Sequence, residues 1–255
     1  MSRIKKTIFI CIAAIAAIAC ILCCLYLFQY FRGNMLNNKL GDNNKISGTV
    51  LPDCAEPTMR ININFKKLTE MNDEIYAWVE VPGTNIDYAV VQSDTDDLFY
   101  NSHSADGSYF SGGSIFSQMH NTKTFQDPVT VLYGHNRQSG DMFAQVNDFA
   151  DSAVFDANRY IYIYTPDKVY QYEIFAAYPH SSEHLLLRHD FSDESEFNEY
   201  FGGLDRNMID SHFRSDLFPQ FGDKVITLST CYRQNRLQRY LLQGVLMQEY
   251  DVAAK

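Results

Sequence analysis

The sequence has few cysteines outside one apolar segment, and this scarcity narrows the kinds of protein it can encode. Of the six cysteines in 255 residues, four lie within the apolar run 8–28, which leaves Cys54 and Cys231 for the rest of the chain. Two thiols do not make a disulfide-dense secreted scaffold. A Cys54–Cys231 bridge is the one pairing left there, and we do not expect it because Cys54 lies in a linker-like stretch.

Charge is also absent from residues 8–28. As a helix, a run of this length covers roughly 30 Å, the hydrocarbon core of a bilayer. Arg3, Lys5 and Lys6 precede the run, which predicts a cytoplasmic N-terminus with the rest of the chain outside. A cleaved signal peptide would have a shorter apolar core. Residues 17–20 resemble a lipoprotein cleavage site, but apolar residues continue beyond Cys20, so we predict a retained anchor.

Internal repeats and low-complexity tracts are missing too, so composition alone divides the chain. We predict a basic cytoplasmic tail at residues 1–6 and a transmembrane signal-anchor helix at 7–31. A linker rich in Asn, Gly and Lys follows at 32–58. Residues 59–255 then form one extracellular domain, long enough for a core of its own.

The part of the chain beyond the apolar segment is acidic. The first 32 residues hold four of the 21 basic side chains and none of the 31 acidic ones, which leaves the remainder with a net charge of −14. This argues against nucleic acid or anionic lipid as a partner of the domain as a whole. Any basic site must therefore be local.

Short apolar segments, many of them alternating, recur through the domain between turn residues, which predicts β-strands. The predicted strands span residues 75–81, 86–92, 114–116, 128–133, 160–164, 169–178 and 225–231, with a last one beginning just after Arg239. Helices are predicted at 65–71, at 142–149 and, with a break at Gly202-Gly203, at 192–210. Many short strands with a few peripheral helices predict a β-barrel or a β-sandwich.

The strand 225–231 ends at Cys231, and a polar loop with Arg233, Arg236 and Arg239 follows. Such an electropositive setting favours the thiolate form of a cysteine. The alternative is a small apolar residue that ends a core strand, the commoner role of a single cysteine. Export of the domain and the lack of a disulfide set favour reactivity, so we predict that Cys231 is a nucleophile.

His135 follows the strand 128–133 after Gly134, and the glycine lets the chain turn so that the imidazole lies at a rim. A histidine at a strand end is often merely exposed or structural. A cysteine and a histidine at separate strand ends nevertheless suit a catalytic pair assembled by the fold.

The segment His180-Ser181-Ser182-Glu183-His184 has the spacing of a zinc-peptidase motif. That chemistry requires both histidines on one helical face. Pro179 and the two serines follow a predicted strand, which disfavours a helix there. We therefore expect neither a metal nor another cofactor.

Several segments, taken together, resemble the sortase family, class B. In chain order they are Trp78–Ile86, Val90–Gln92, Tyr133–Asn136, Gly140–Phe143 and Thr227–Cys231, with an arginine that opens the last strand. The N-terminal anchor fits as well. The likeness covers essentially residues 60–250, and the joint occurrence of these segments is far more specific than any one of them.

The resemblance implies a mostly β fold, a single eight-stranded barrel with peripheral helices, one of which residues 192–210 would supply. It implies a thiol-protease-like hydrolase and transpeptidase on the outer face of a Gram-positive cell membrane. Its partners would be secreted proteins with a C-terminal sorting signal and an amine of the peptidoglycan precursor.

By the same resemblance, Cys231 would attack the carbonyl of the Thr in the sorting motif. His135 would protonate the leaving amine and deprotonate the incoming one, and Arg239 would hold the substrate backbone and the oxyanion. The residues implied in substrate binding are Asn136, Ser229, Thr230 and Tyr232.

The sequence departs from the class B pattern in three places. Some class B enzymes have an Asp two residues after the cysteine, where this chain has Arg233, so no acid is assigned. Residues 96–100 replace the usual Asn-x-x-Tyr-Leu, which leaves the sorting motif open. The loop after Cys231 is short, so Arg233 and Arg236 stay alternatives to Arg239, which we favour because strand-rooted groups are better preorganised. A pilin-polymerising sortase with a Lys acceptor and a non-catalytic surface binding domain are the alternative functions.

Overall fold

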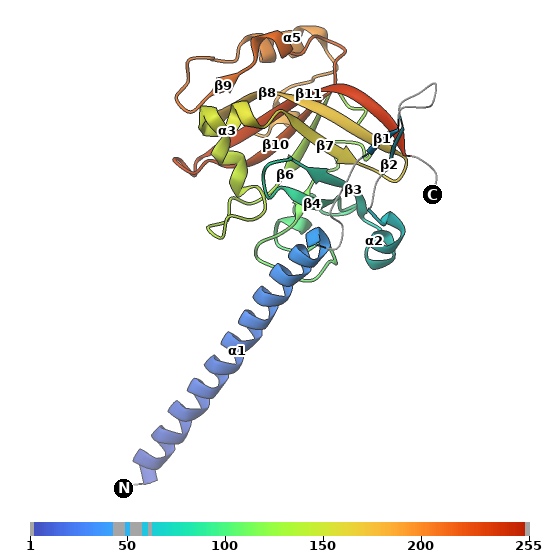
Figure 1. The fold of residues 1–255 in the computed structure, drawn as a ribbon. Coiled ribbons are helices and arrows are strands. Elements are labelled where there is room, and N and C mark those ends of the chain that lie inside the picture. The colour runs from blue at the N-terminus through green and yellow to red at the C-terminus, as the bar shows by residue number, and fades with distance from the viewer. Residues whose placement is uncertain (1–2, 43–48, 52–57, 61–62, 253–255) are drawn as a thin grey trace.

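A long N-terminal helix projects from a β-barrel in this protein (Figure 1). The structure is a computed structural model and describes residues 3–42, 49–51, 58–60 and 63–252. Cys54, and with it the disulfide question, lies outside these residues, whereas Cys231 is a free thiol.

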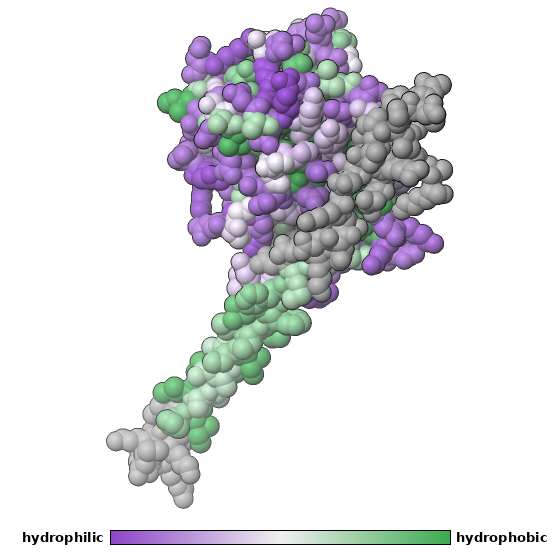
Figure 2. Space-filling view, in the orientation of Figure 1, coloured by the Kyte–Doolittle hydropathy of each residue, from purple (hydrophilic) through white to green (hydrophobic). Residues whose placement is uncertain are grey.

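Helix α1 runs from Arg3 to Asp42. Within it, Phe9–Gly33 is long and apolar enough to cross a membrane, and Figure 2 shows this stretch as a continuous hydrophobic surface below the domain. The helix passes residue 31, where we predicted its end, so the first part of the predicted linker is helical. The prediction weighed the Asn, Gly and Lys content and the lack of hydrophobic periodicity, but Met, Leu and Lys between residues 35 and 40 each favour a helix on their own.

The C-terminal part of α1 contacts the domain. Arg32 Nη2 donates to Asp106 Oδ2 at 3.1 Å, and the ring of Tyr30 lies 6.5 Å from that of Phe110. The guanidinium of Arg137 lies 5.5 Å from the centre of the Tyr30 ring. The C-terminal part of α1 therefore touches the loop that carries His135.

Eight strands form a closed barrel. Their order is β11-β10-β6-β5-β4-β3-β7-β8, and β8 pairs with β11 to close the ring. The strands are β3 (Ile75–Glu80), β4 (Asp87–Val91), β5 (Ile115–Phe116), β6 (Val129–Tyr133), β7 (Tyr160–Tyr164), β8 (Lys168–Ser181), β10 (Val225–Cys231) and β11 (Gln238–Val252). The predicted eight-stranded barrel is confirmed, and the β8–β11 pairing excludes an open sandwich.

Short strands and helices extend the barrel. The additional strands are β2 (Thr58–Arg60) beside β11, β1 (Thr49–Leu51) beside β2, and β9 (His212–Phe213) beside β8. The helices are α2 (Phe65–Met71), η1 (Phe99–Asn101), η2 (Ala144–Ala150), α3 (Ser152–Ala157), α4 (Leu185–Arg188), α5 (Glu194–Gly202) and η3 (Ser215–Leu217), where η marks a 3₁₀-helix.

Two predicted helices differ from those observed. The helix expected at 142–149 is the 3₁₀-helix η2, followed by α3. The helix expected at 192–210 is only α5, which begins where Asp193 caps the amides of Ser195 and Glu196. It ends at Gly202 because the glycine pair is a poor helix continuation and Gly203 closes the last turn by donating to the Glu199 carbonyl.

Period-two alternation divides each barrel strand between an inner and an outer face. All eight strands contribute to one cluster of buried apolar side chains, to which Ile226 and Leu228 of β10 belong. The intervening residues Thr227, Ser229 and Cys231 emerge on the other face and line a cavity. Helix α5 packs on the outer face of β8, β10 and β11 through a second cluster that includes Phe197 and Phe201.

Candidate active site

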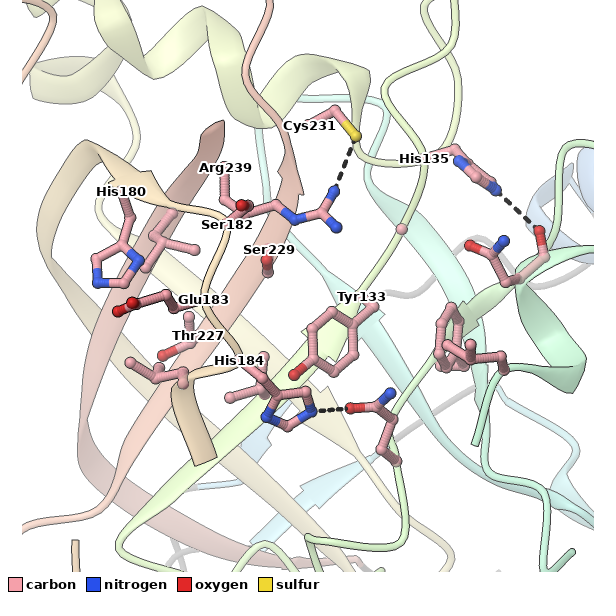
Figure 3. Close-up of a pocket in the computed structure, with 18 residues that line it drawn as sticks. Tyr133, His135, His180, Ser182, Glu183, His184, Thr227, Ser229, Cys231 and Arg239 are labelled. Carbon is pink, nitrogen blue, oxygen red and sulfur yellow. Dashed lines mark hydrogen bonds between the residues drawn. The ribbon is translucent and has the colours of Figure 1, made fainter. Parts of the chain in front are cut away.

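Cys231 and Arg239 are direct partners in the β10–β11 ladder. Side chains of directly opposed residues in an antiparallel pair lie on the same face, close together. Accordingly, Arg239 Nη1 donates to Cys231 Sγ at 2.9 Å, as Figure 3 shows. Strand register alone therefore brings a guanidinium to the thiol.

The other two arginines of the loop do not reach the sulfur. Arg233 Nη1 donates to Asp148 Oδ1 at 2.9 Å and its Nη2 to the Ala144 carbonyl at 3.0 Å, so this side chain lies along η2. Arg236 is exposed at the tip of the loop. Of the three candidates, Arg239 is the one in contact with the thiol.

Two amides hold the backbone at Cys231. Asn136 Nδ2 and Asn147 Nδ2 both donate to the Cys231 carbonyl, at 3.0 and 3.2 Å. Asn147 Oδ1 also accepts the amide of Arg233 at 2.7 Å. The main chain on both sides of Tyr232 is thus tied to residues far away in sequence. Sequence reasoning missed Asn147, and an amide inside a short helix gives no local signal of such a role.

His135 lies on the loop after β6 and lines the same cavity as Cys231 and Arg239. Its Nε2 lies 2.8 Å from the Asn101 carbonyl, and since a carbonyl only accepts, Nε2 carries the proton. Figure 3 shows the ring turned away from the sulfur, towards that carbonyl. The structure brings the predicted pair into one cavity but does not place the two side chains in contact.

Two glycines pack around His135: Gly134 in the loop that carries it, and Gly113 against the Asn101 carbonyl that its ring contacts. Gly134 does not have a left-handed backbone, and a Cβ there would lie 2.7 Å from Cγ of the Phe143 ring, so the glycine allows close packing of this loop. Gly113, at φ +61°, packs against the carbonyls of Tyr100 and Asn101, where a Cβ would approach within 2.7 and 2.8 Å. The acceptor of His135 is therefore fixed by a glycine that sequence analysis did not single out.

The cavity has a volume of about 410 Å³, and β6, β10 and β11 form one of its walls. Ser229 lines it, as predicted for a substrate-binding residue. Thr230 is on the opposite face of β10 because of strand alternation, and its hydroxyl donates to the Gly134 carbonyl at 2.7 Å. Tyr232 is turned to Asp210 and stacks on Tyr240.

Asn136 and Tyr232 also lie outside the lining of this cavity, and each lines a different hollow. The substrate-binding role predicted for Asn136, Thr230 and Tyr232 thus has no support from the lining of this cavity. Asn136 donates to the Cys231 carbonyl, Thr230 to the Gly134 carbonyl and Tyr232 to the Asp210 carboxylate.

The segment 180–184 forms another wall of the cavity. It is not helical: His180 is at the end of β8, and His184 caps α4 by accepting the Leu187 amide on Nδ1. The opposite nitrogen, Nε2, therefore donates to Gln118 Oε1 at 2.5 Å. Burial, assisted by the neighbouring His120, lowers the pKa of His184. Within the described part of the chain no group of three or more metal-ligating side chains gathers.

The arrangement is suited to nucleophilic chemistry at a carbonyl. A free thiol at the cavity edge has a guanidinium beside it that can stabilise an oxyanion, and an imidazole in the same cavity that can move a proton.

Comparisons with known proteins point to one family. A family model described as "Sortase domain" matches residues 79–247. Sortase B of Listeria monocytogenes is 28% identical over 216 residues, which cover 80% of this chain and 86% of that protein. Sortase B of Staphylococcus aureus is 27% identical over 167 residues, with 66% and 67% covered. The crystal structure of Clostridium perfringens sortase B superposes with a TM-score of 0.65 and 29% identity, covering 72% of this chain and all of that one.

Proposed function

The chain belongs to the sortase family, class B, a family of cysteine transpeptidases, and from this membership we propose that it anchors secreted proteins to the cell wall. In this proposal it cleaves a C-terminal sorting motif after Thr, holds the new carboxyl end as a thioacyl-enzyme, and joins it to an amine of a cell-wall precursor. The observation that carries the proposal is the contact between Arg239 Nη1 and Cys231 Sγ in a cavity that His135 also lines.

In the first half-reaction the Cys231 thiol gives its proton to His135, the thiolate attacks the carbonyl carbon of the Thr, and a C–S bond forms. The oxyanion lies next to the Arg239 guanidinium, which is already in place because of the strand register. Loss of one such donor typically raises the barrier by about 2.7–4 kcal/mol. When the C–N bond breaks, His135 donates the proton that the leaving amine needs.

For that step the imidazole must leave the Asn101 carbonyl and turn into the cavity. In the second half-reaction an amine attacks the thioester, and His135 takes up its proton. A thioester lets the intermediate survive long enough to meet an amine, which explains the use of a thiol.

The chain layout supports a location at the outer face of the cell membrane. Residues 1–6 carry the basic charge that keeps a terminus in the cytoplasm, and the anchor predicted at 7–31 contains most of the apolar stretch Phe9–Gly33 that is long enough to span the bilayer. Residues 32–58 then connect the anchor to the extracellular catalytic domain, 59–255, which meets secreted proteins that bear a sorting signal.

The test uses the full chain in detergent micelles and a peptide library in which Thr is constant and its neighbours vary. Mass spectrometry detects a thioacyl adduct on the peptide that contains Cys231, and then the product joined to an added amine. Cys231→Ala abolishes both, and a joined product from that variant would refute the assignment.

The same experiment separates the alternatives. A product linked through the side chain of Lys in a second protein identifies pilin polymerisation instead of cell-wall anchoring. If Cys231 in the folded protein does not react with iodoacetamide at neutral pH, the domain is a binding module and not an enzyme.

A further inference from the structure

Cys231 borders two separate hollows. Besides the cavity of about 410 Å³, it lines a second hollow of about 370 Å³ together with Asn136, Arg137, Arg233 and Arg236. Among the described lining residues Cys231 is common to both. We call the second one the basic hollow.

The charge of the basic hollow contrasts with that of the domain. Residues 33–255 carry a net charge of −14, yet three arginines and no acidic residue line this site. A concentration of one charge against the overall sign marks a place where ligands of the opposite sign are favoured.

Two of the arginines are held in position by carboxylates that lie outside the hollow. Arg137 Nη1 pairs with Asp141 at 2.5 Å, and Arg233 Nη1 pairs with Asp148 at 2.9 Å. Neither carboxylate lines the hollow. Arg236 differs, because within the described residues no carboxylate lies within salt-bridge distance of it. Its charge is therefore the least compensated of the three.

We propose that the basic hollow binds an anionic group, a carboxylate or a phosphate, carried by the amine that resolves the thioacyl-enzyme. Guanidinium groups present forked donors that match the oxygens of either anion. This inference rests on the proposed function and adds the chemical class of the second substrate: an amine on an anionic carrier.

The two-hollow arrangement suits the second half-reaction. While the acyl group on Cys231 occupies the larger cavity, the acceptor needs a separate approach to the thioester, and the basic hollow begins at the same sulfur. The amine nitrogen attacks the thioester carbonyl, a C–N bond forms and the C–S bond breaks. The amine proton passes to His135 and the electron pair stays on sulfur, so the step needs no redox partner.

The arginines also act on the protonation of the amine. Nearby positive charge disfavours an ammonium ion, so an amine held in the basic hollow is kept more in the neutral, nucleophilic form. The same charge repels a small cationic amine that lacks an anionic group. Selection and activation of the acceptor thus have one electrostatic cause.

The first experiment compares charged and neutral acceptors on the full chain in micelles, with an acyl donor from the peptide library. The acceptors are glycylglycine against its C-terminal amide, and 2-aminoethyl phosphate against ethanolamine, which separate carboxylate from phosphate recognition. We expect the KM of an anionic acceptor to be about fivefold lower than that of its neutral partner at low salt. Arg236→Gln removes this difference, and Arg236→Lys keeps most of it.

The second experiment does not depend on any peptide. Iodoacetate is anionic and iodoacetamide is neutral, and mass mapping follows the alkylation of Cys231 separately from the cysteines of α1. We expect the ratio of the iodoacetate rate to the iodoacetamide rate to fall about threefold in Arg236→Gln and in high salt. Arg188→Gln, an exposed arginine in the last turn of α4, is the matched control and should leave the ratio unchanged.

The outcomes separate the two hypotheses. If no thioacyl adduct forms with any peptide, the proposed function fails, and the alkylation ratio still decides whether the basic hollow attracts anions. If the adduct forms but wild type does not distinguish charged from neutral acceptors, this inference is overturned. It is also overturned if Arg236→Gln lowers the use of both acceptors equally.

Discussion

The β10–β11 strand pair and the loop after β6 both bring a functional group to the cavity, but they do so with different degrees of preorganisation. Cys231 and Arg239 are opposed in a ladder of seven paired positions, and the guanidinium already contacts the sulfur. His135 lies on the loop, and its Nε2–H donates a hydrogen bond to the Asn101 carbonyl. Strand register fixes the relative position of Cys231 and Arg239, whereas the position of His135 depends on the contacts that its side chain makes.

This difference in preorganisation separates the two catalytic tasks of the proposed reaction. Oxyanion stabilisation requires no rearrangement at the strand pair, whereas proton transfer requires His135 to exchange one partner for another. Substitutions on the two sides should therefore have distinguishable effects, and the following predictions run from the largest to the smallest.

The largest effect is expected from removal of the proton donor. His135→Gln should slow thioacyl formation by roughly 10²–10⁴-fold, because general acid catalysis contributes about that much. Reaction of Cys231 with iodoacetamide should change little, since Arg239 stays in contact with the thiol. His189→Gln is the control, and a comparable loss in that variant would contradict a specific role for His135.

Arg239→Met should slow thioacyl formation by about 10²–10³-fold, the usual effect of losing an oxyanion donor. Arg239→Lys should recover part of this, because a point charge replaces the forked guanidinium. The matched control is Arg233→Gln, whose guanidinium bonds Asp148 and not the sulfur, and which should stay within about threefold of wild type. A larger loss in Arg233→Gln than in Arg239→Met would reverse the assignment.

Gly113→Ala should act on the loop side alone. The new Cβ would press on the Asn101 carbonyl, and a left-handed φ costs a non-glycine residue about 1–3 kcal/mol. We expect thioacyl formation to slow about tenfold as His135 loses its acceptor geometry. Alkylation of Cys231 should be unaffected. Gly107→Ala is the control, because Gly107 also has a positive φ but open space around its Cα.

The Gly107→Ala control also separates the effect of backbone strain from the effect of displacing the Asn101 carbonyl. Both alanine variants carry the cost of the left-handed backbone, which thermal unfolding measures. Only Gly113→Ala moves the partner of His135. Equal losses of activity in the two variants would show that backbone strain, and not the Asn101 contact, is responsible.

The smallest effect concerns pH and the wall formed by residues 180–184. Since burial lowers the pKa of His184, the folded state binds the proton less well than the unfolded chain, whose histidine titrates near the ordinary value of 6.5. The stability that the neutral ring contributes is present above that pH and is lost as the pH falls below it. His184→Asn keeps a good helix cap without titrating.

We therefore expect the melting temperature of wild type to fall more between pH 7 and pH 5 than that of His184→Asn, by a few degrees at most. Thermal unfolding monitored by circular dichroism measures both. An identical fall in the two proteins would mean that His184 stays uncoupled from folding in this range.

Much of the architecture could be read from the sequence because it depends on local patterns. Helix α2 and the hairpin of β3 and β4 follow from apolar periodicity and a Pro-Gly turn, and an uncharged run long enough for a bilayer predicts an apolar anchor helix. Cys231 and the preference for Arg239 also follow from local order, because a short loop between paired strands returns the second strand opposite the first. Where local pattern was ambiguous, as at residues 142–149 and 203–210, the predicted helices were wrong in type or length.

What only the tertiary structure decided are the contacts between distant segments. Asn147 meets the Cys231 carbonyl, Gly113 fixes the acceptor of His135, and Arg236 joins a basic hollow with the thiol. Closure of the barrel brings these residues together, and no local periodicity encodes which of them meet. The sequence by itself determined the strands, the anchor and the reactive residue types. The barrel determined which way the histidine turns and that the thiol borders two hollows, because barrel closure brings together segments that are far apart in the chain.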